Sequence, residues 1–379
     1  MKIVADENLA LVRELFAGTG ELVCKPGRAM TAGDVRDADV LLVRSVTRVN
    51  ADLLAGSRVG FVGTATIGTD HLDLDWLRQA GIRVAAAPGC NARSVVEYVL
   101  SGLCDLWRRG RLDWENAVFG VVGLGNVGAR LARVLQGLGL NVLGSDPLVC
   151  HDDIEQQPLE VLLREANVLS LHTPLTRGGA FPTWHLLDEA RLSSWRHPGM
   201  LINSGRGAVI DNQALRRLVE AGFIQGQDVI LDVWEHEPEI DAGLLDLIGL
   251  GTPHIAGYSQ EGKWQGSLMI YDALADFARL GPVDVAGLLP SGVTSLTLEG
   301  SGWQALAGLI EDVYPIRRDD ADLRHACRLP VTLRAAAFDA LRKQYWPRRE
   351  FSAAMVQIAP GVDERTRTLA RALGFRLAE

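Results

Sequence analysis

A glycine-rich turn between two apolar runs constrains the fold of this chain most strongly. The turn reads Gly123-Leu124-Gly125-Asn126-Val127-Gly128, and it follows the apolar run 118–122. Apolar residues at helical spacing come next, namely Leu131, Val134, Leu135 and Leu138. Asp146 lies 18 residues after Gly128, at the end of a second apolar run over 141–145. Strand, glycine turn, helix, strand and acid in this order are the pattern of a dinucleotide-binding βαβ unit.

Each part of this pattern has a physical reason. Glycines let the backbone turn tightly and approach a pyrophosphate, and the helix N-terminus offers that anion unpaired N–H groups and a positive dipole end. The carboxylate of Asp146 would accept hydrogen bonds from ribose hydroxyls and repel a 2′-phosphate. The pattern therefore predicts a dinucleotide site and favours NAD over NADP.

Composition excludes several classes of protein. The chain has 379 residues, enough for two or three domains, and a net charge of −9, which argues against a general affinity for nucleic acid or anionic membranes. No apolar run reaches the roughly 20 residues of a membrane span, and the N-terminus is typical of a strand rather than of a signal peptide. We therefore expect a cytoplasmic protein.

The cysteines fit a reducing compartment. They are scattered, odd in number and form no CxxC pair: Cys24, Cys90, Cys104, Cys150 and Cys327. This pattern predicts neither a disulfide framework nor a metal site. Cys90 is either a reactive thiol or, as the absence of a neighbouring base favours, a small residue in a tight loop.

Strands and helices alternate through most of the chain, as in α/β proteins with parallel sheets. Strands are expected at 2–5, 22–24, 40–43, 61–63, 84–86, 118–122, 141–145, 168–171, 200–203 and 229–233. Helices are expected over Leu9–Phe16 and Asn91–Trp107. Ligands of such sheets gather beyond the carboxyl ends of the strands.

The last 90 or so residues change character and predict a separate α+β module. Strands are expected at 295–298 and 351–356, with alternating apolar residues that suit pairing with a second copy of the chain. The aromatic residues Trp303, Tyr345 and Trp346 fit such an interface. The alternative is a monomeric appendage whose aromatic residues fill its own small core.

Three polar residues stand at expected strand ends and could carry out chemistry. Arg206 lies between two glycines, and arginine suits a carboxylate because it donates two parallel hydrogen bonds. His254 could move a proton, and the carboxylate of Glu237 could hold its tautomer and stabilise its imidazolium. Spacing alone does not exclude Glu235 and His236 for these two roles.

Six segments, taken together and in order, resemble the D-isomer-specific 2-hydroxyacid dehydrogenases over about residues 1–280. They are the glycine turn 123–128, Asp146, His172-Thr173-Pro174-Leu175, Ile202-Asn203-Ser204-Gly205-Arg206-Gly207, Asp232-Val233-Trp234-Glu235-His236-Glu237-Pro238 and Pro253-His254-Ile255-Ala256-Gly257. The resemblance implies an oxidoreductase with Arg206, Glu237 and His254 as its catalytic residues. It implies contacts to NAD from Gly123, Gly125, Asn126, Val127, Gly128, Asp146, Thr173, Asp232 and Gly257.

Further segments narrow the resemblance to family members that oxidise 4-phospho-D-erythronate to 2-oxo-3-hydroxy-4-phosphobutanoate in vitamin B6 synthesis. They are residues 67–73, 88–92, 254–263 and 314–320. The resemblance implies that Ser45, Thr66 and Tyr258 contact the substrate, although the first two could equally cap turns. Arg44 is the first candidate for the phosphate of this small-molecule substrate, and basic residues of the C-terminal region are the second.

The expected fold class is α/β with two doubly wound parallel-sheet domains and a C-terminal α+β dimerisation domain. A Rossmann cofactor domain (93–257) is inserted in a flavodoxin-like substrate domain (1–92 and 258–282), and the dimerisation domain covers 285–379. Two other functions remain open at this point. One is a phosphoglycerate or a hydroxypyruvate/glyoxylate dehydrogenase, and the other is a non-enzymatic NAD(H)-sensing protein like the corepressors that resemble this family.

Overall fold

We analysed a computed structural model of the chain, which describes residues 1–195, 199–285, 288 and 294–378. The chain divides into two compact units. Residues 1–91 and 259–292 form the first unit, and residues 92–258 and 293–379 form the second. No helix in the described ranges is both long enough and apolar enough to span a membrane.

The first unit is built on a parallel sheet of five strands in the order β2-β1-β3-β4-β5. This is the flavodoxin-like order, as predicted. The strands are β1 (Lys2–Asp6), β2 (Glu21–Lys25), β3 (Val40–Val43), β4 (Phe61–Thr64) and β5 (Arg83–Ala86). Each was expected within one or two residues, because each is a short apolar run bounded by turn residues.

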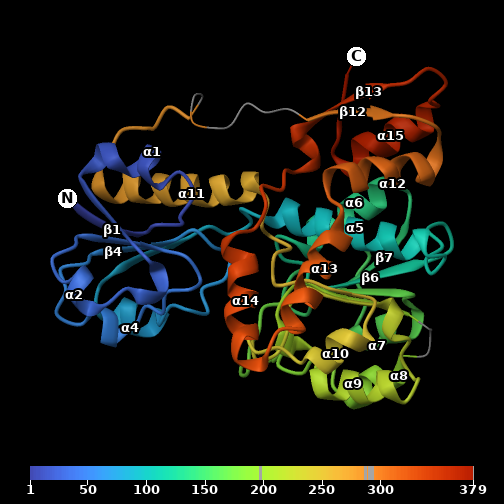
Figure 1. Cartoon of the computed structure of the whole chain (residues 1–379), viewed down its shortest axis with the longest axis horizontal. Helices are drawn as coiled ribbons and strands as arrows, with labels where there is room; N and C mark the ends of the chain where they lie inside the picture. The colour runs from blue at the N-terminus through green and yellow to red at the C-terminus, as the bar shows by residue number, and fades with distance from the viewer. Residues whose placement is uncertain (196–198, 286–287, 289–293, 379) are drawn as a thin grey trace. The chain divides into compact units, whose positions relative to one another are not determined.

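Helices cover both faces of this sheet (Figure 1). Neighbouring residues of a strand face opposite sides, so Ile3 packs in one core with α1 and α11, whereas Val4 packs in another with α3 and α4. The helices are α1 (Val12–Phe16), α2 (Ala32–Val35), α3 (Ala51–Leu54), α4 (Leu74–Gln79) and α11 (Gln260–Ala278).

In this unit the structure departs from the predicted length of helix α1 and favours one of the two predicted roles of Cys90. Helix α1 is shorter than the predicted Leu9–Phe16, because Leu11 adopts a left-handed backbone conformation with φ of 52°. Cys90 is buried in the core that α11 covers, which fits a packing residue better than a reactive thiol. No disulfide joins cysteines within the described ranges.

The second unit contains a parallel sheet of six strands in the order β11-β10-β9-β8-β6-β7. The strands are β6 (Val118–Val122), β7 (Asn141–Ser145), β8 (Val168–Leu171), β9 (Met200–Asn203), β10 (Val229–Leu231) and β11 (Leu250–Gly251). The strand order reverses between β6 and β8, so the chain leaves these two neighbours in opposite directions. This doubly wound arrangement is the predicted one, and ligands of such sheets bind beyond the carboxyl ends of the strands where the order reverses, here β6 and β8.

Helices again form a layer on each face of the sheet. One layer consists of α5 (Ala92–Arg108) and α6 (Gly128–Gly137). The other consists of α7 (Leu159–Glu165), α8 (Glu189–Ser194), α9 (Asn212–Glu220) and α10 (Ala242–Leu247). Figure 1 shows α7 to α10 below β6 and β7, with α5 and α6 above them.

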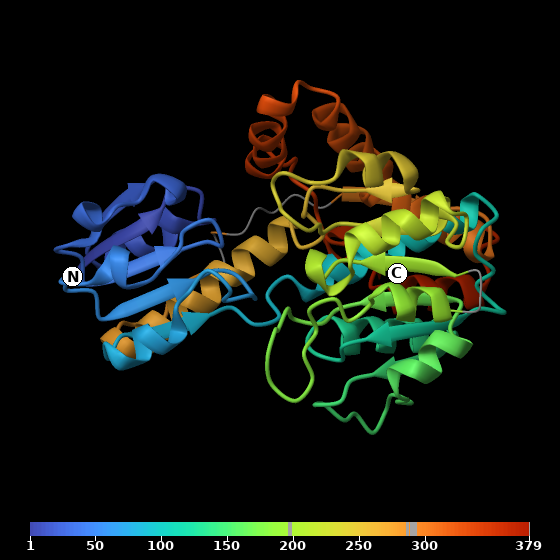
Figure 2. The same cartoon turned by 90° about the horizontal axis from the view of Figure 1, so that it is seen from below.

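The C-terminal residues add a small parallel sheet, in the order β12-β13-β14, and four helices. The strands are β12 (Thr294–Leu298), β13 (Ala354–Ile358) and β14 (Arg376–Leu377); a 3₁₀ turn over Phe351–Ala353 replaces the start of the predicted strand 351–356. The helices are α12 (Gly302–Val313), α13 (Ile316–Cys327), α14 (Val331–Lys343) and α15 (Glu364–Leu373). Both views show α13 and α14 side by side (Figures 1 and 2).

These C-terminal residues share a hydrophobic core with α5 and α6 instead of forming a unit of their own. The ring of Trp303 stacks on Trp114, with 4.4 Å between ring centroids. Tyr345 and Trp346 both donate hydrogen bonds to the buried carboxylate of Asp319. The three aromatic residues therefore pack within the chain, and the predicted limits of three separate domains stay a prediction.

Candidate active site

The glycine turn joins β6 to α6, and its glycines meet different demands. Gly123 has a φ of 86°, a left-handed conformation that side chains disfavour. A Cβ atom at Gly128 would overlap the carbonyl oxygen of Gly123, so this position requires glycine for packing. A Cβ atom at Gly125 would meet no protein atom within 4 Å. Gly125 therefore borders open space at the N-terminus of α6, where a pyrophosphate fits.

Asp146 follows β7 and closes the other side of this turn. Its carboxylate accepts a 2.8 Å hydrogen bond from the backbone N–H of Leu124, and further bonds from the N–H groups of Leu148 and Val149 at 2.8 and 3.1 Å. A carboxylate has about four lone-pair positions, so one remains for a ribose hydroxyl. The neighbouring Asn126 is exposed, and Val127 precedes the first residue of α6.

Two buried hydroxyl groups beyond β8 and β9 fit a polar ligand. Within the ranges that the structure describes, Thr173 Oγ1 and Ser204 Oγ are shielded from solvent and have no hydrogen-bond partner. Buried hydroxyls without partners are costly, and a bound ligand is one explanation for them. Together with the open space at Gly125, they show that these strand ends fit a dinucleotide.

Arg206 stands in the loop after β9, which its neighbours hold. The side chain of Asn203 accepts a 3.1 Å hydrogen bond from the N–H of Gly205 and donates a 3.0 Å bond to the carbonyl of Arg206. A Cβ atom at Gly207 would overlap the backbone of Trp234, so the loop packs directly on the next one. Arg206 Nη1 donates to the carbonyl of Gly205 at 2.8 Å.

His254 and Glu237 form a hydrogen-bonded pair at the ends of β10 and β11. The distance between His254 Nδ1 and Glu237 Oε2 is 2.6 Å, and Glu237 Oε1 accepts a 2.9 Å bond from the N–H of Trp234. Burial by itself would raise the pKa of Glu237, but the attraction and hydrogen bond of His254 outweigh it and lower that pKa. Glu237 is therefore ionised and holds the proton of His254 on Nδ1.

Hydrogen bonds with two side chains, Asp232 and Arg348, hold the loop that carries His254. The buried carboxylate of Asp232 accepts hydrogen bonds from the N–H groups of Ile255 and Ala256 at 2.8 and 2.9 Å, and from Thr252 Oγ1 at 2.6 Å. Arg348, from the C-terminal region, donates a 2.6 Å bond to the carbonyl of Ala256. Asp232 thus has a structural role in the chain, and its expected contact to the cofactor stays a prediction, as does that of Gly257.

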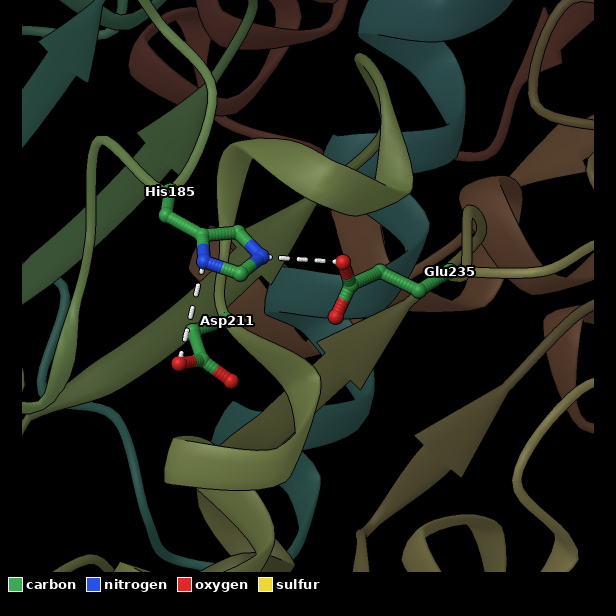
Figure 3. Close-up of side chains that lie close together, drawn as sticks. All are labelled: His185, Asp211 and Glu235. Carbon is green, nitrogen blue, oxygen red and sulfur yellow. Dashed lines mark hydrogen bonds and ion pairs between the residues drawn. The ribbon is translucent and has the colours of Figure 1, made fainter.

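The neighbours of Glu237 in the sequence have other partners. Glu235 accepts hydrogen bonds from His185 Nε2 and from the N–H of Asn212, both at 2.9 Å. Figure 3 shows His185 between Glu235 and Asp211, whose carboxylate lies 3.7 Å from Nδ1. One potential ligand atom from each of these three side chains lies within 4.8 Å of the other two. His236 is exposed.

The remaining candidates lie in the first unit, after β3 and β4. Arg44 donates a 3.0 Å hydrogen bond from Nε to the buried Asp6, and Ser45 is exposed. Thr66 Oγ1 donates to the carbonyl of Gly68 at 2.9 Å and lies 2.8 Å from Thr64 Oγ1. Thr66 therefore stabilises a turn, the alternative role that its sequence context left open.

One residue near the His254 pair was not singled out by the sequence. Arg342, on α14, places its guanidinium carbon 5.7 Å from the centroid of the Tyr258 ring. Tyr258 was predicted as a substrate residue from the resemblance. Nothing in the sequence around Arg342 distinguishes it from the other arginines of the C-terminal region.

Comparisons with known proteins give a family for two parts of the chain. Residues 105–256 match the family model of the D-isomer specific 2-hydroxyacid dehydrogenase NAD binding domain, and residues 288–374 match a domain family of unknown function, DUF3410. In the solved structures, a D-lactate dehydrogenase from Aquifex aeolicus, complexed with NAD and lactic acid, is 23% identical with a TM-score of 0.61. It covers 75% of this chain, and the match spans 100% of that structure. This likeness confirms the fold.

Relatives that match over nearly the full length of this chain have higher sequence identity to it. An erythronate-4-phosphate dehydrogenase from Pseudomonas syringae pv. syringae is 50% identical over 99% of this chain and 99% of its own length. A protein of the same name from Azotobacter vinelandii is 51% identical over 99% of both chains. The chain therefore belongs to the erythronate-4-phosphate dehydrogenases, within the NAD-dependent D-isomer-specific 2-hydroxyacid dehydrogenase family.

Proposed function

We propose that this protein oxidises 4-phospho-D-erythronate at C2 with NAD, giving 2-oxo-3-hydroxy-4-phosphobutanoate for pyridoxal phosphate biosynthesis. The observation that carries the proposal is the 2.6 Å contact between His254 and Glu237, which lie in the same unit as Arg206. The full-length relatives named erythronate-4-phosphate dehydrogenase support the choice of substrate.

His254 is the proposed base of the reaction. Its Nδ1 faces Glu237, which leaves Nε2 to take the proton of the substrate's C2 hydroxyl. The carboxylate of Glu237 stabilises the imidazolium that forms and keeps the ring in one orientation. The clamps on residues 255 and 256 limit the movement of the ring, so little entropy remains to be lost in the transition state.

Arg206 is the proposed partner of the substrate's carboxylate. Its guanidinium can donate two parallel hydrogen bonds to that group and can attract the C2 oxygen as its bond order changes. NAD, when bound, supplies the acceptor for the hydride that leaves C2. Residues at the glycine turn, with Asp146, Thr173 and Ser204, would hold it.

Two finer expectations belong to this proposal. We expect a homodimer, formed through the C-terminal region, and a cytoplasmic location, which the absence of disulfides among described residues supports. Light scattering should give twice the mass of one chain. A chain that ends near residue 285 should be monomeric or a weaker, less soluble dimer; a tight and fully active dimer of that truncated chain would contradict the role of the C-terminal region.

The test of the proposed reaction is the absorbance of NADH with 4-phosphoerythronate, 3-phosphoglycerate and D-glycerate side by side. We expect kcat/KM to be highest for 4-phosphoerythronate, and we expect NAD to be preferred over NADP because Asp146 repels a 2′-phosphate. A higher kcat/KM for 3-phosphoglycerate would identify a different dehydrogenase. Turnover with none of the three would favour a binding protein.

A further inference from the structure

A second cation lies beside the His254–Glu237 pair, and it comes from the C-terminal region. Arg342 is near the end of α14, and its guanidinium carbon is 5.7 Å from the ring centroid of Tyr258. Tyr258 itself is four residues after His254 and donates its backbone N–H to the carbonyl of Ile255. The same helix reaches the loop of His254 at Pro253, which lines a pocket of about 170 Å³ with Ala340, Leu341 and Gln344.

The hydrogen-bond donors of Arg342 are only partly paired within the protein. Its Nε atom is shielded from solvent and, within the described ranges, has no hydrogen-bond partner. A buried donor on a charged group is expensive to leave unpaired, so a missing partner is the expected explanation. Tyr258 hydrogen-bonds to the side chain of Arg342 and also offers the cation its ring, so the donor that remains unpaired is Nε.

The electrostatics around Arg342 indicate what that partner carries. Burial opposes its charge, yet Tyr258, Glu237 and Asp232 together raise the pKa of Arg342. In return, the Arg342 charge helps to lower the pKa of Glu237. Arg342 is therefore cationic and close to the two acids that surround His254. Without it, these acids would repel an anionic substrate from the base.

The charge of the substrate requires more than Arg206. A phosphate monoester carries a charge of about −1.5 to −2 at pH 7, in addition to the carboxylate. Arginine binds phosphate through paired hydrogen bonds. The first candidate for this group, Arg44, already donates its Nε to Asp6 at 3.0 Å, whereas Nε of Arg342 has no hydrogen-bond partner among the described residues.

We propose that Arg342 of helix α14 binds the phosphate group of the substrate and thereby lets the C-terminal region select phosphorylated 2-hydroxy acids. This inference rests on the proposed function, because it names the residue that binds the phosphate group of the proposed substrate. It assigns a role in recognition to a region whose family model has no known function.

The first experiment removes the phosphate and the guanidinium in turn. The kcat/KM values of the wild type and of Arg342→Gln are measured with 4-phosphoerythronate and with D-erythronate. Loss of a hydrogen-bonded charge pair should lower kcat/KM for the phosphorylated substrate by roughly 10- to 100-fold, and that for D-erythronate by less than about 3-fold. Arg342→Lys should recover part of the loss, because it keeps the charge without the fork of donors.

The matched control is Lys343→Gln. It makes the same change of charge at the next residue of α14, where the side chain is exposed. We expect it to leave the ratio of the two kcat/KM values unchanged within about 2-fold, since exposed charges are screened. If this ratio changed equally in Lys343→Gln and Arg342→Gln, the effect would come from the loss of any positive charge on α14, and the proposal would be overturned.

A second readout does not depend on turnover. Inorganic phosphate, titrated calorimetrically into the NAD-loaded wild type and Arg342→Lys, should bind the wild type and bind the variant at least several-fold more weakly. Equal binding to both would overturn the proposal. So would an equal loss of kcat/KM with both substrates in Arg342→Gln, which would mean that Arg342 only positions Glu237. If the wild type instead fails to oxidise 4-phosphoerythronate, the proposed function fails, and the phosphate titration still decides whether Arg342 binds this anion.

Discussion

At the scale of single residues, the site depends on which carboxylate meets which imidazole. Glu235 and Glu237 are two positions apart, yet Glu235 pairs with His185 and Glu237 pairs with His254. The N–H of Trp234 donates to Glu237, whereas the N–H of Asn212 donates to Glu235. Backbone contacts thus aim two similar side chains at different histidines.

The variant Glu237→Gln tests this pair. Without the carboxylate, the imidazolium that forms on His254 during the reaction loses its hydrogen-bonded counter-charge. We expect kcat to fall by roughly 10- to 100-fold. The loss of kcat is measured by NADH absorbance.

The control for this prediction is Glu235→Gln, which makes the same change two residues away. Its loss of the bond to His185 should lower stability more than it lowers kcat. If Glu235→Gln lowered kcat and Glu237→Gln did not, the assignment of the two acids would be reversed.

At the scale of elements, the glycines of the turn between β6 and α6 have two different roles, one in packing and one in ligand binding. Gly128 lies where α6 meets the end of β6, and a side chain there would overlap the carbonyl of Gly123. Gly125, three residues earlier, faces open space. Glycine at 128 therefore allows two backbone segments to pack closely, whereas glycine at 125 leaves space for a ligand.

The pair Gly128→Ala and Gly125→Ala tests this division. Gly128→Ala should reduce the free energy of unfolding by about 1–3 kcal/mol, the usual cost of overpacking. Gly125→Ala should change it by less than about 1 kcal/mol but raise the KM for NAD, because its methyl group occupies the space for the pyrophosphate. Urea unfolding and NAD titrations measure the two effects. An unchanged KM for NAD in Gly125→Ala would place the pyrophosphate elsewhere.

At the scale of the whole molecule, stability depends on groups that the folded chain keeps uncharged or paired. His172, at the end of β8, lies beside Ser170, with 2.8 Å between Nε2 and Oγ. Burial lowers the pKa of His172 to about 3, from 6.5 in an unfolded chain. Below pH 6.5 the unfolded chain therefore binds a proton that the folded chain does not bind until about pH 3, so acid favours unfolding.

This difference in the pKa of His172 predicts that the free energy of unfolding decreases as the pH falls. Between pH 7 and pH 5, His172 should reduce the free energy of unfolding by about 1–2 kcal/mol. In His172→Gln this part of the slope should disappear, as measured by urea unfolding at pH 7, 6 and 5. The control is His325→Gln on α13, which removes an exposed histidine and should keep the wild-type slope. An unaltered slope in His172→Gln would mean that the ring can be protonated in the folded chain.

The sequence by itself determined the elements and their order. Strands such as Val118–Val122 and Met200–Asn203 were predicted at their observed bounds, because short apolar runs between turn residues leave few alternatives. The glycine turn with Asp146 predicted the dinucleotide site from local backbone geometry alone. The choice of Glu237 over Glu235 came from resemblance to a family, since both residues have the same chemistry.

Only the tertiary structure decided which distant residues meet. It placed Glu237 on His254 and Glu235 on His185, it used Asp232 to clamp the loop of His254, and it brought Arg342 to Tyr258 from 84 residues away. It also packed the C-terminal residues into one hydrophobic core with α5 and α6. These contacts depend on packing between elements far apart in the chain, and no local pattern of residues records them.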